Sequence, residues 1–197
     1  MKDPKLDFLQ ELGNIGAGHA TTALSKMLDG RRLQLVIPEA DLIPFEQAAQ
    51  LMQGEEEAPV AGIYIQVSGD ASGHMAFILP LESAMTLVKL LTFDDSGVLN
   101  EMALSALQEV GNIMITSYLN AMSSMTGLVM APSVPGVAID MAGAVWESIL
   151  AGALIADHVT VIKTDFFTDE ESLGGHIIFL PDEEDFEKIA VILGLET

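Results

Sequence analysis

The chain has 197 residues, half of them apolar, which is typical of one domain or of two tightly fused halves with a sizeable core. It contains no cysteine, which excludes disulfides, thiol nucleophiles and thiolate metal sites and fits a reducing compartment. Eight Lys and Arg stand against 29 Asp and Glu, so the formal net charge of -21 disfavours binding to nucleic acid or to anionic membranes.

The acidity has two interpretations that charge alone does not separate. It can serve solubility or adaptation to high salt, or it can match a partner with a basic surface. The N-terminal sequence lacks the basic start and apolar run of a signal peptide. The longest apolar stretch, Met141 to Ala156, carries Glu147 and is shorter than the roughly 20 residues that span a bilayer. We therefore expect a cytoplasmic protein that does not enter the membrane.

The hydrophobic pattern predicts a mixed α/β fold of the α+β type, in which each half runs long helix, strand, middle helix, strand pair and closing helix. The two long helices are expected over residues 6–30 and 103–127. Asn100 is a suitable N-cap for the second helix. Both segments end on a glycine, Gly30 and Gly127, where a helix C-terminal cap would fall.

Five segments rich in apolar and β-branched residues predict strands. They are Leu33–Ile37, Gly62–Ser68, Met75–Leu79, Val159–Thr164 and Ile177–Leu180. Turn residues at Ser68-Gly69-Asp70 and at Leu173-Gly174-Gly175 predict hairpins, so the strands should be antiparallel. We expect two layers, one antiparallel sheet shared by both halves and both long helices on one side of it.

The chain also repeats itself. Residues 9–15, LQELGNI, match residues 107–113, LQEVGNI, at an offset of 98 (107 − 9). A second pair, GHMAFILP from Gly73 and GHIIFLP from Gly175, follows in the same order. Two such matches in order indicate an internal duplication. We predict a single domain, residues 1–197, made of two repeats of about 1–96 and 97–197.

Each long helix carries a Glu and an Asn three residues apart on the face opposite its apolar side. The first face holds Asp7, Glu11 and Asn14, and the second holds Ser105, Glu109 and Asn112. Ordinary solvated faces are the alternative, and for the glutamates that alternative is strong. In a helix interior, asparagine costs several tenths of a kcal/mol relative to Ala. The neighbouring glycine, Gly13 or Gly111, costs roughly 1 kcal/mol more. That cost recurs at matched positions, which favours a functional face.

The repeated pattern resembles the signature of the CheC family of chemotaxis phosphatases, which is related to CheX and FliY. The signature is Asp or Ser, three residues, Glu, two residues, Asn, and a Pro somewhat over twenty residues later. Pro135 follows Asn112 after 22 residues, as the family pattern requires. Pro38 follows Asn14 after 23, which predicts a slightly different loop at the first site. The resemblance covers nearly the whole chain and implies a pseudo-twofold fold with two long site-bearing helices.

What the resemblance implies is a phosphatase that hydrolyses the aspartyl-phosphate of a CheY-type response regulator. The implied roles are water positioning for Asn14 and Asn112, docking of the regulator for Glu11 and Glu109, and the edge of each site for Asp7 and Ser105. No metal or cofactor of its own is implied, and Mg²⁺ is expected on the response regulator. Such a site needs little covalent chemistry, because an acyl phosphate is reactive and water placement is the main task.

The resemblance leaves a second function open, that of an adaptor for the CheD deamidase with weak or no phosphatase activity. The presence of Glu and Asn at both sites favours the enzyme. A flagellar-switch component resembling the FliY phosphatases is a more distant alternative, since we expect no room for a switch domain.

Two other patterns are weaker. Gly13, Gly16 and Gly18 are spaced G-x-x-G-x-G inside a periodic helix, so close helix packing is favoured over a phosphate-binding loop. The four histidines show no metal-ligand spacing.

Overall fold

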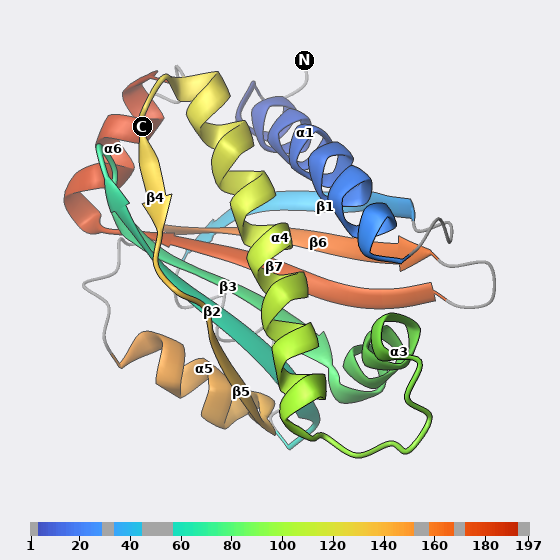
Figure 1. The fold of residues 1–197 in the computed structure, drawn as a ribbon. Helices are drawn as coiled ribbons and strands as arrows, with labels where there is room; N and C mark the ends of the chain where they lie inside the picture. Colours follow the sequence, from blue (N-terminus) through green and yellow to red (C-terminus); the bar gives the residue numbers. More distant parts are fainter. Residues whose placement is uncertain (1–3, 29–33, 45–56, 152–157, 168–171, 193–197) are drawn as a thin grey trace.

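The computed structural model of the protein describes residues 4–28, 34–44, 57–151, 158–167 and 172–192. Its elements in chain order are α1 (Pro4–Met27), β1 (Gln34–Pro44), β2 (Pro59–Gly69), β3 (Gly73–Pro80), α3 (Leu81–Thr92), α4 (Glu101–Thr126), β4 (Met130–Pro132), β5 (Gly136–Met141), α5 (Ala142–Leu150), β6 (His158–Phe167), β7 (Ser172–Pro181) and α6 (Glu183–Ile192). Figure 1 shows α1 and α4 lying across a broad sheet. Within these ranges, no helix is long and apolar enough to cross a membrane.

Seven strands form one sheet in the order β1-β6-β7-β3-β2-β4, and β5 pairs with β2 next to β4. Every pairing is antiparallel, which confirms the predicted fold class. The five predicted strands correspond to β1, β2, β3, β6 and β7. The hairpin between β2 and β3 turns after Gly69, whose φ of 127° lies in the region that favours glycine.

One predicted turn is wrong. Leu173-Gly174-Gly175 belongs to β7 and pairs with β6 as regular strand. Close packing requires glycine at position 175, because a Cβ there would lie 2.7 Å from Cδ2 of Leu79 in the neighbouring β3. Glycine inside a strand can mark a close approach as well as a turn.

The sheet carries helices on both faces, so the predicted two-layer arrangement is incomplete. Alternate residues of β2 point to opposite sides. Ile63 and Ile65 join the core beneath α1 and α4, whereas Val60 and Tyr64 join a second core beneath α5. Trp146 of α5 is buried in that second core. The result is a third layer on the face away from α1 and α4 (Figure 1).

The middle of the sheet is the pair β3 and β7, which contain the repeated Gly-His segments. They run antiparallel from Gly73 opposite Pro181 to Ile78 opposite His176. The register is reciprocal, because His74 faces Leu180 just as His176 faces Ile78. A twofold relation between two halves of the chain would produce this pairing.

The ends of α4 follow the expected chemistry. The Asn100 Oδ1 accepts a hydrogen bond of 2.9 Å from the backbone N–H of Ala103, which confirms the N-cap. Gly127 ends the helix with φ 74° and ψ 2°, which confirms the C-cap. Gly30 lies outside the described residues.

Candidate functional site

Glycines bring the two long helices close to the sheet and to each other. A Cβ on Gly13 of α1 would lie 2.9 Å from Cγ2 of Ile37 in β1, and one on Gly111 of α4 would lie 2.3 Å from Cγ2 of Ile63 in β2. At Gly16 a Cβ would lie 2.7 Å from the ring of a tyrosine on α4. The packing interpretation is therefore confirmed at these positions. Gly18 differs, since a Cβ there would meet nothing within 4 Å.

The predicted site residues lie on the outer faces of these helices. Glu11 and Asn14 are exposed on α1, and Glu109 is exposed on α4 with Asn112 half-buried one turn later. Ser105 is exposed one turn before Glu109. Asp7 lies on α1, but its side chain is outside the described part of the structure. Each Glu–Asn pair thus stands on its own helix, and the structure presents two exposed faces.

A glutamine beside each glutamate was not predicted as a site residue. The Gln10 Nε2 donates a hydrogen bond of 3.0 Å to the carbonyl oxygen of Ile37, and the Gln108 Nε2 donates one of 2.5 Å to that of Pro135. The two donors are 98 residues apart (108 − 10), and so are the two acceptors (135 − 37). Each helix is therefore tied to its neighbouring outer strand by the same bond. Both glutamines belong to the repeated LQE string, so the sequence repeat alone could have identified them as matched residues.

Both acceptor carbonyls lie where the outer strand is irregular. The register of β1 against β6 shifts between Val36 and Glu39, and three residues separate the end of β4 from the start of β5. Such irregularities bend a strand and re-aim its residues. Because Ile37 is the counterpart of Pro135, Pro38 comes one residue later than the second site would place it. The irregularity lies within β1 at the first site and between β4 and β5 at the second.

An exposed valine precedes each acceptor carbonyl. Val134 is 84% exposed and Val36 is 38% exposed, and they too are 98 residues apart (134 − 36). The hydrogen bonds from Gln108 and Gln10 bring these loops against the helices that carry the Glu–Asn pairs. Each long helix therefore has an exposed apolar side chain on the outer-strand segment to which it is hydrogen-bonded.

The two asparagines differ in their surroundings. The Asn112 Oδ1 accepts a hydrogen bond of 3.4 Å from Thr116 Oγ1, one turn along α4. Asn14 has no hydrogen-bond partner for its side chain among the described residues. The residue one turn beyond Asn14 is Gly18, which offers no side chain.

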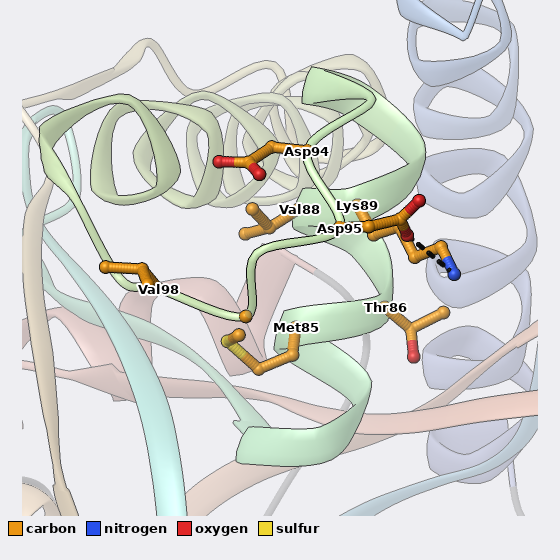
Figure 2. A pocket seen from close by; sticks show the side chains of 8 residues that line it. Met85, Thr86, Val88, Lys89, Asp94, Asp95 and Val98 are labelled. Atoms are coloured by element: carbon orange, nitrogen blue, oxygen red, sulfur yellow. Dashed lines mark ion pairs between the residues drawn. The ribbon is translucent and has the colours of Figure 1, made fainter.

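A pocket of about 200 Å³ lies between α3 and the connection that leads to α4. Figure 2 shows the side chains that line it. Met85 and Val98 supply apolar walls, and Lys89 forms a 2.8 Å ion pair with Asp95 at its side. A hydrogen bond from the backbone N–H of Ser96 lowers the pKa of the Asp94 carboxyl below its ordinary value. None of the six predicted site residues lines this pocket.

The described residues also lack a group of three or more His, Asp or Glu side chains that could hold a metal ion. The chemistry available on the two helix faces is that of a carboxamide and a carboxylate in contact with solvent. A carboxamide both donates and accepts hydrogen bonds, so it can orient a water molecule without taking its proton. The exposed side chains of these faces are accessible to a second macromolecule.

The model of the CheC-like family matches residues 5–33 and 102–139, which contain both Glu–Asn pairs. The CheY-P phosphatase CheC of Bacillus subtilis (strain 168) is 36% identical over 203 residues, covering 98% of this chain and 96% of that protein.

Two solved structures share the fold. Thermotoga maritima FliY superposes with a TM-score of 0.77 at 17% identity, covering 100% of this chain and 99% of that one. A chain of the CheX–CheY–BeF3–Mg²⁺ complex of Borrelia burgdorferi superposes with a TM-score of 0.53 at 16% identity, covering 85% of this chain and 96% of that one. At such identities the likeness concerns the fold alone. The sequence identity to the Bacillus protein, which extends along nearly the full length of both chains, shows that this chain belongs to the CheC-like family.

Proposed function

We propose that the protein is a phosphatase that hydrolyses the aspartyl-phosphate of a CheY-type response regulator. The observation that carries the proposal is the recurrence of a Glu–Asn pair, each with an exposed Glu, at matched positions of α1 and α4. Both pairs fall inside the stretches that match the family model, and a relative of 36% identity is named a CheY-P phosphatase.

In this proposal the carboxamides of Asn14 and Asn112 orient the attacking water. The water oxygen forms a new bond to phosphorus as the bond between phosphorus and the regulator's aspartate oxygen breaks. The aspartate leaves as a carboxylate, and the proton of the water passes to the released phosphate or to solvent. Mg²⁺ belongs to the regulator, where it stabilises charge on the transferring phosphoryl group. The amide supplies position, which can account for a large part of the rate of such a reaction.

Glu11 and Glu109 contact a basic residue of the regulator in this proposal, with Asp7 and Ser105 at the edge of each interface. Glu11, Ser105 and Glu109 are exposed, which leaves them accessible to a partner. The net charge of -21 favours a basic partner surface through long-range attraction. Since the regulator is a cytoplasmic signalling protein, the proposal also places this protein in the cytoplasm.

We also propose that the chain is one domain made of two repeats, about 1–96 and 97–197. The reciprocal register of β3 and β7 supports the proposal, as does the matched pair of bonds from Gln10 and Gln108. Each repeat then contributes one long helix and one site, so a single chain offers two sites.

The test is the decay of phosphorylated CheY, loaded with a small phosphodonor, with and without the protein. Wild type should accelerate the decay, and the double variant Asn14→Ala, Asn112→Ala should lose at least about tenfold of that acceleration. Asn120→Ala is a matched control, because Asn120 is exposed on α4 outside both pairs. Circular dichroism checks that each variant is folded. A folded wild type that leaves the decay unchanged would contradict the proposal, and binding of a CheD deamidase would then be the function to test.

A further inference from the structure

The inference concerns Thr116, which no part of the proposed mechanism uses. Thr116 lies one turn after Asn112 on α4 and is half-buried, and its hydroxyl donates to the carboxamide oxygen Oδ1 of Asn112 at 3.4 Å. That distance is long for an O–H···O hydrogen bond. The contact therefore biases the orientation of the carboxamide and leaves it able to adjust when a partner docks.

The direction of this hydroxyl is unusual for a helix in this protein. Serine and threonine inside helices commonly donate to the backbone carbonyl four residues earlier. Thr22, Thr92, Thr126 and Ser148 do so here, at 2.7 to 2.9 Å. Thr116 instead donates to the side chain of the residue four positions earlier, Asn112, over a longer distance than these four backbone hydrogen bonds. Its geometry serves Asn112.

The first site lacks this contact. The counterpart of Thr116 at the offset of 98 is Gly18 (116 − 98), which has no side chain. A Cβ at Gly18 would meet nothing within 4 Å, so the space is open. Asn14 is exposed, whereas Asn112 is half-buried. The two carboxamides therefore stand on equivalent turns of two helices but only one of them has a neighbour that orients it.

We propose that Thr116 is a positioning residue that orients the carboxamide of Asn112, and that its replacement by Gly18 makes the Asn14 site the slower of the two. The inference rests on the proposed phosphatase function. With Oδ1 held by Thr116, the Nδ2 hydrogens of Asn112 point away from that contact and stay available to a phosphoryl oxygen. The second lone pair of Oδ1 accepts from the attacking water. Asn14 keeps its rotational freedom in the docked complex and loses it only on reaching the transition state, which lowers the rate of the chemical step at the first site.

The activity test isolates each site in the full chain. In an Asn14→Ala background only the second site works, and Thr116→Val should lower kcat about two- to tenfold with KM unchanged. Valine matches threonine in shape and lacks the hydroxyl. Thr116→Ser keeps the hydroxyl and should restore most of the rate.

The reciprocal test uses an Asn112→Ala background, in which only the first site works. Gly18→Thr should raise kcat by a similar factor, and Gly18→Val, which fills the same space without a hydroxyl, should not. Equal kcat values for Thr116→Val and its parent would overturn the proposal. So would equal rates for Gly18→Thr and Gly18→Val.

A second measurement separates this inference from the phosphatase function itself. NMR relaxation of the side-chain Nδ2–H₂ groups should give a higher order parameter for Asn112 than for Asn14, and Thr116→Val should remove the difference. Equal order parameters in the wild type would overturn the proposal whatever the activity. An ordered Asn112 in a protein that does not accelerate CheY-P decay would instead overturn the phosphatase function, and the ranking of the two sites with it.

Discussion

Gly16 of α1 lies directly against the aromatic ring of Tyr118 of α4. A Cβ added to Gly16 would come within 2.7 Å of Cδ1 of that ring, and Tyr118 is fully buried. Burial also raises the pKa of the Tyr118 hydroxyl. At this contact the helix of one proposed site packs on the helix of the other, so the two sites share a buried interface between α1 and α4.

The first prediction follows from that contact. Gly16→Ala should destabilise the protein by about 1–3 kcal/mol, because overpacking against a buried ring exceeds the gain in helix propensity. The measurement is the free energy of unfolding in urea. Gly18→Ala is the matched control on the same helix, and its open surroundings should let it stabilise the protein by up to about 1 kcal/mol. Equal effects of the two substitutions would mean that the interface between α1 and α4 tolerates a methyl group at Gly16.

The second prediction concerns docking. Glu109→Gln should raise the KM for phosphorylated regulator about two- to fivefold with little change in kcat, since an exposed ion pair is weak and acts on association. The difference should shrink at 1 M salt, where charges are screened within about 3 Å.

Initial rates at two salt concentrations check this. Glu147→Gln removes the same charge on α5, on the far layer of the sheet, and should leave KM close to wild type. A rise in KM of the same size for Glu147→Gln would show that total charge matters and that Glu109 makes no specific contact.

The third prediction concerns the bond between α4 and the break in the outer strand. Gln108→Leu should cost about 1 kcal/mol of stability, because the half-buried side chain no longer donates to the Pro135 carbonyl. Gln10→Leu should cost a similar amount through Ile37. Urea midpoints give the values.

Gln66→Leu serves as the control for these variants. Its side chain is exposed on β2 and makes no hydrogen bond within the described ranges, so the midpoint should barely move. If Gln66→Leu lowers the midpoint as much as Gln108→Leu, the loss reflects leucine exposure and not the missing bond.

The fourth prediction concerns the start of α4. Asn100→Ala should destabilise the protein by about 1 kcal/mol, because the Ala103 N–H loses its side-chain acceptor. Asn120→Ala, in the exposed interior of the same helix, should be neutral or slightly stabilising. Thermal unfolding followed by circular dichroism distinguishes the two, and a loss of similar size in both would argue against a capping role for Asn100.

Much of the fold was predictable because its signals are local. The periodicity of the long helices, the cap at Asn100 and the glycine at Gly127 act through residues a few positions away. The Glu–Asn pairs were visible because the same unfavourable helix residues occur twice at one offset. These features depend on the chain itself and less on what it packs against.

The missed features depend on contacts between distant segments. Residues 131–135, with two prolines, resemble a loop, and β4 and β5 are strands because β2 pairs with them. The apolar pattern of α5 does not say which face of the sheet it covers. The partners of Gln108 and Thr116 likewise follow from the strand register and from one rotamer, neither of which is fixed by composition.

The pairing of β3 with β7 has a consequence for how the molecule can come apart. It joins residues 73–78 of one half to residues 176–181 of the other, and the pairings of β1 with β6 and of β2 with β4 and β5 join the same two halves, so separating the halves would leave all of these strands with unpaired edges. Exposed edges of this kind bind another strand. A cut in the connection between α3 and α4 should therefore yield two fragments that reassemble by strand pairing, or that each pair with a copy of themselves. A substitution that destabilises one long helix would then promote unfolding of the other as well, and the single chain would behave as a dimer whose subunits do not dissociate on dilution.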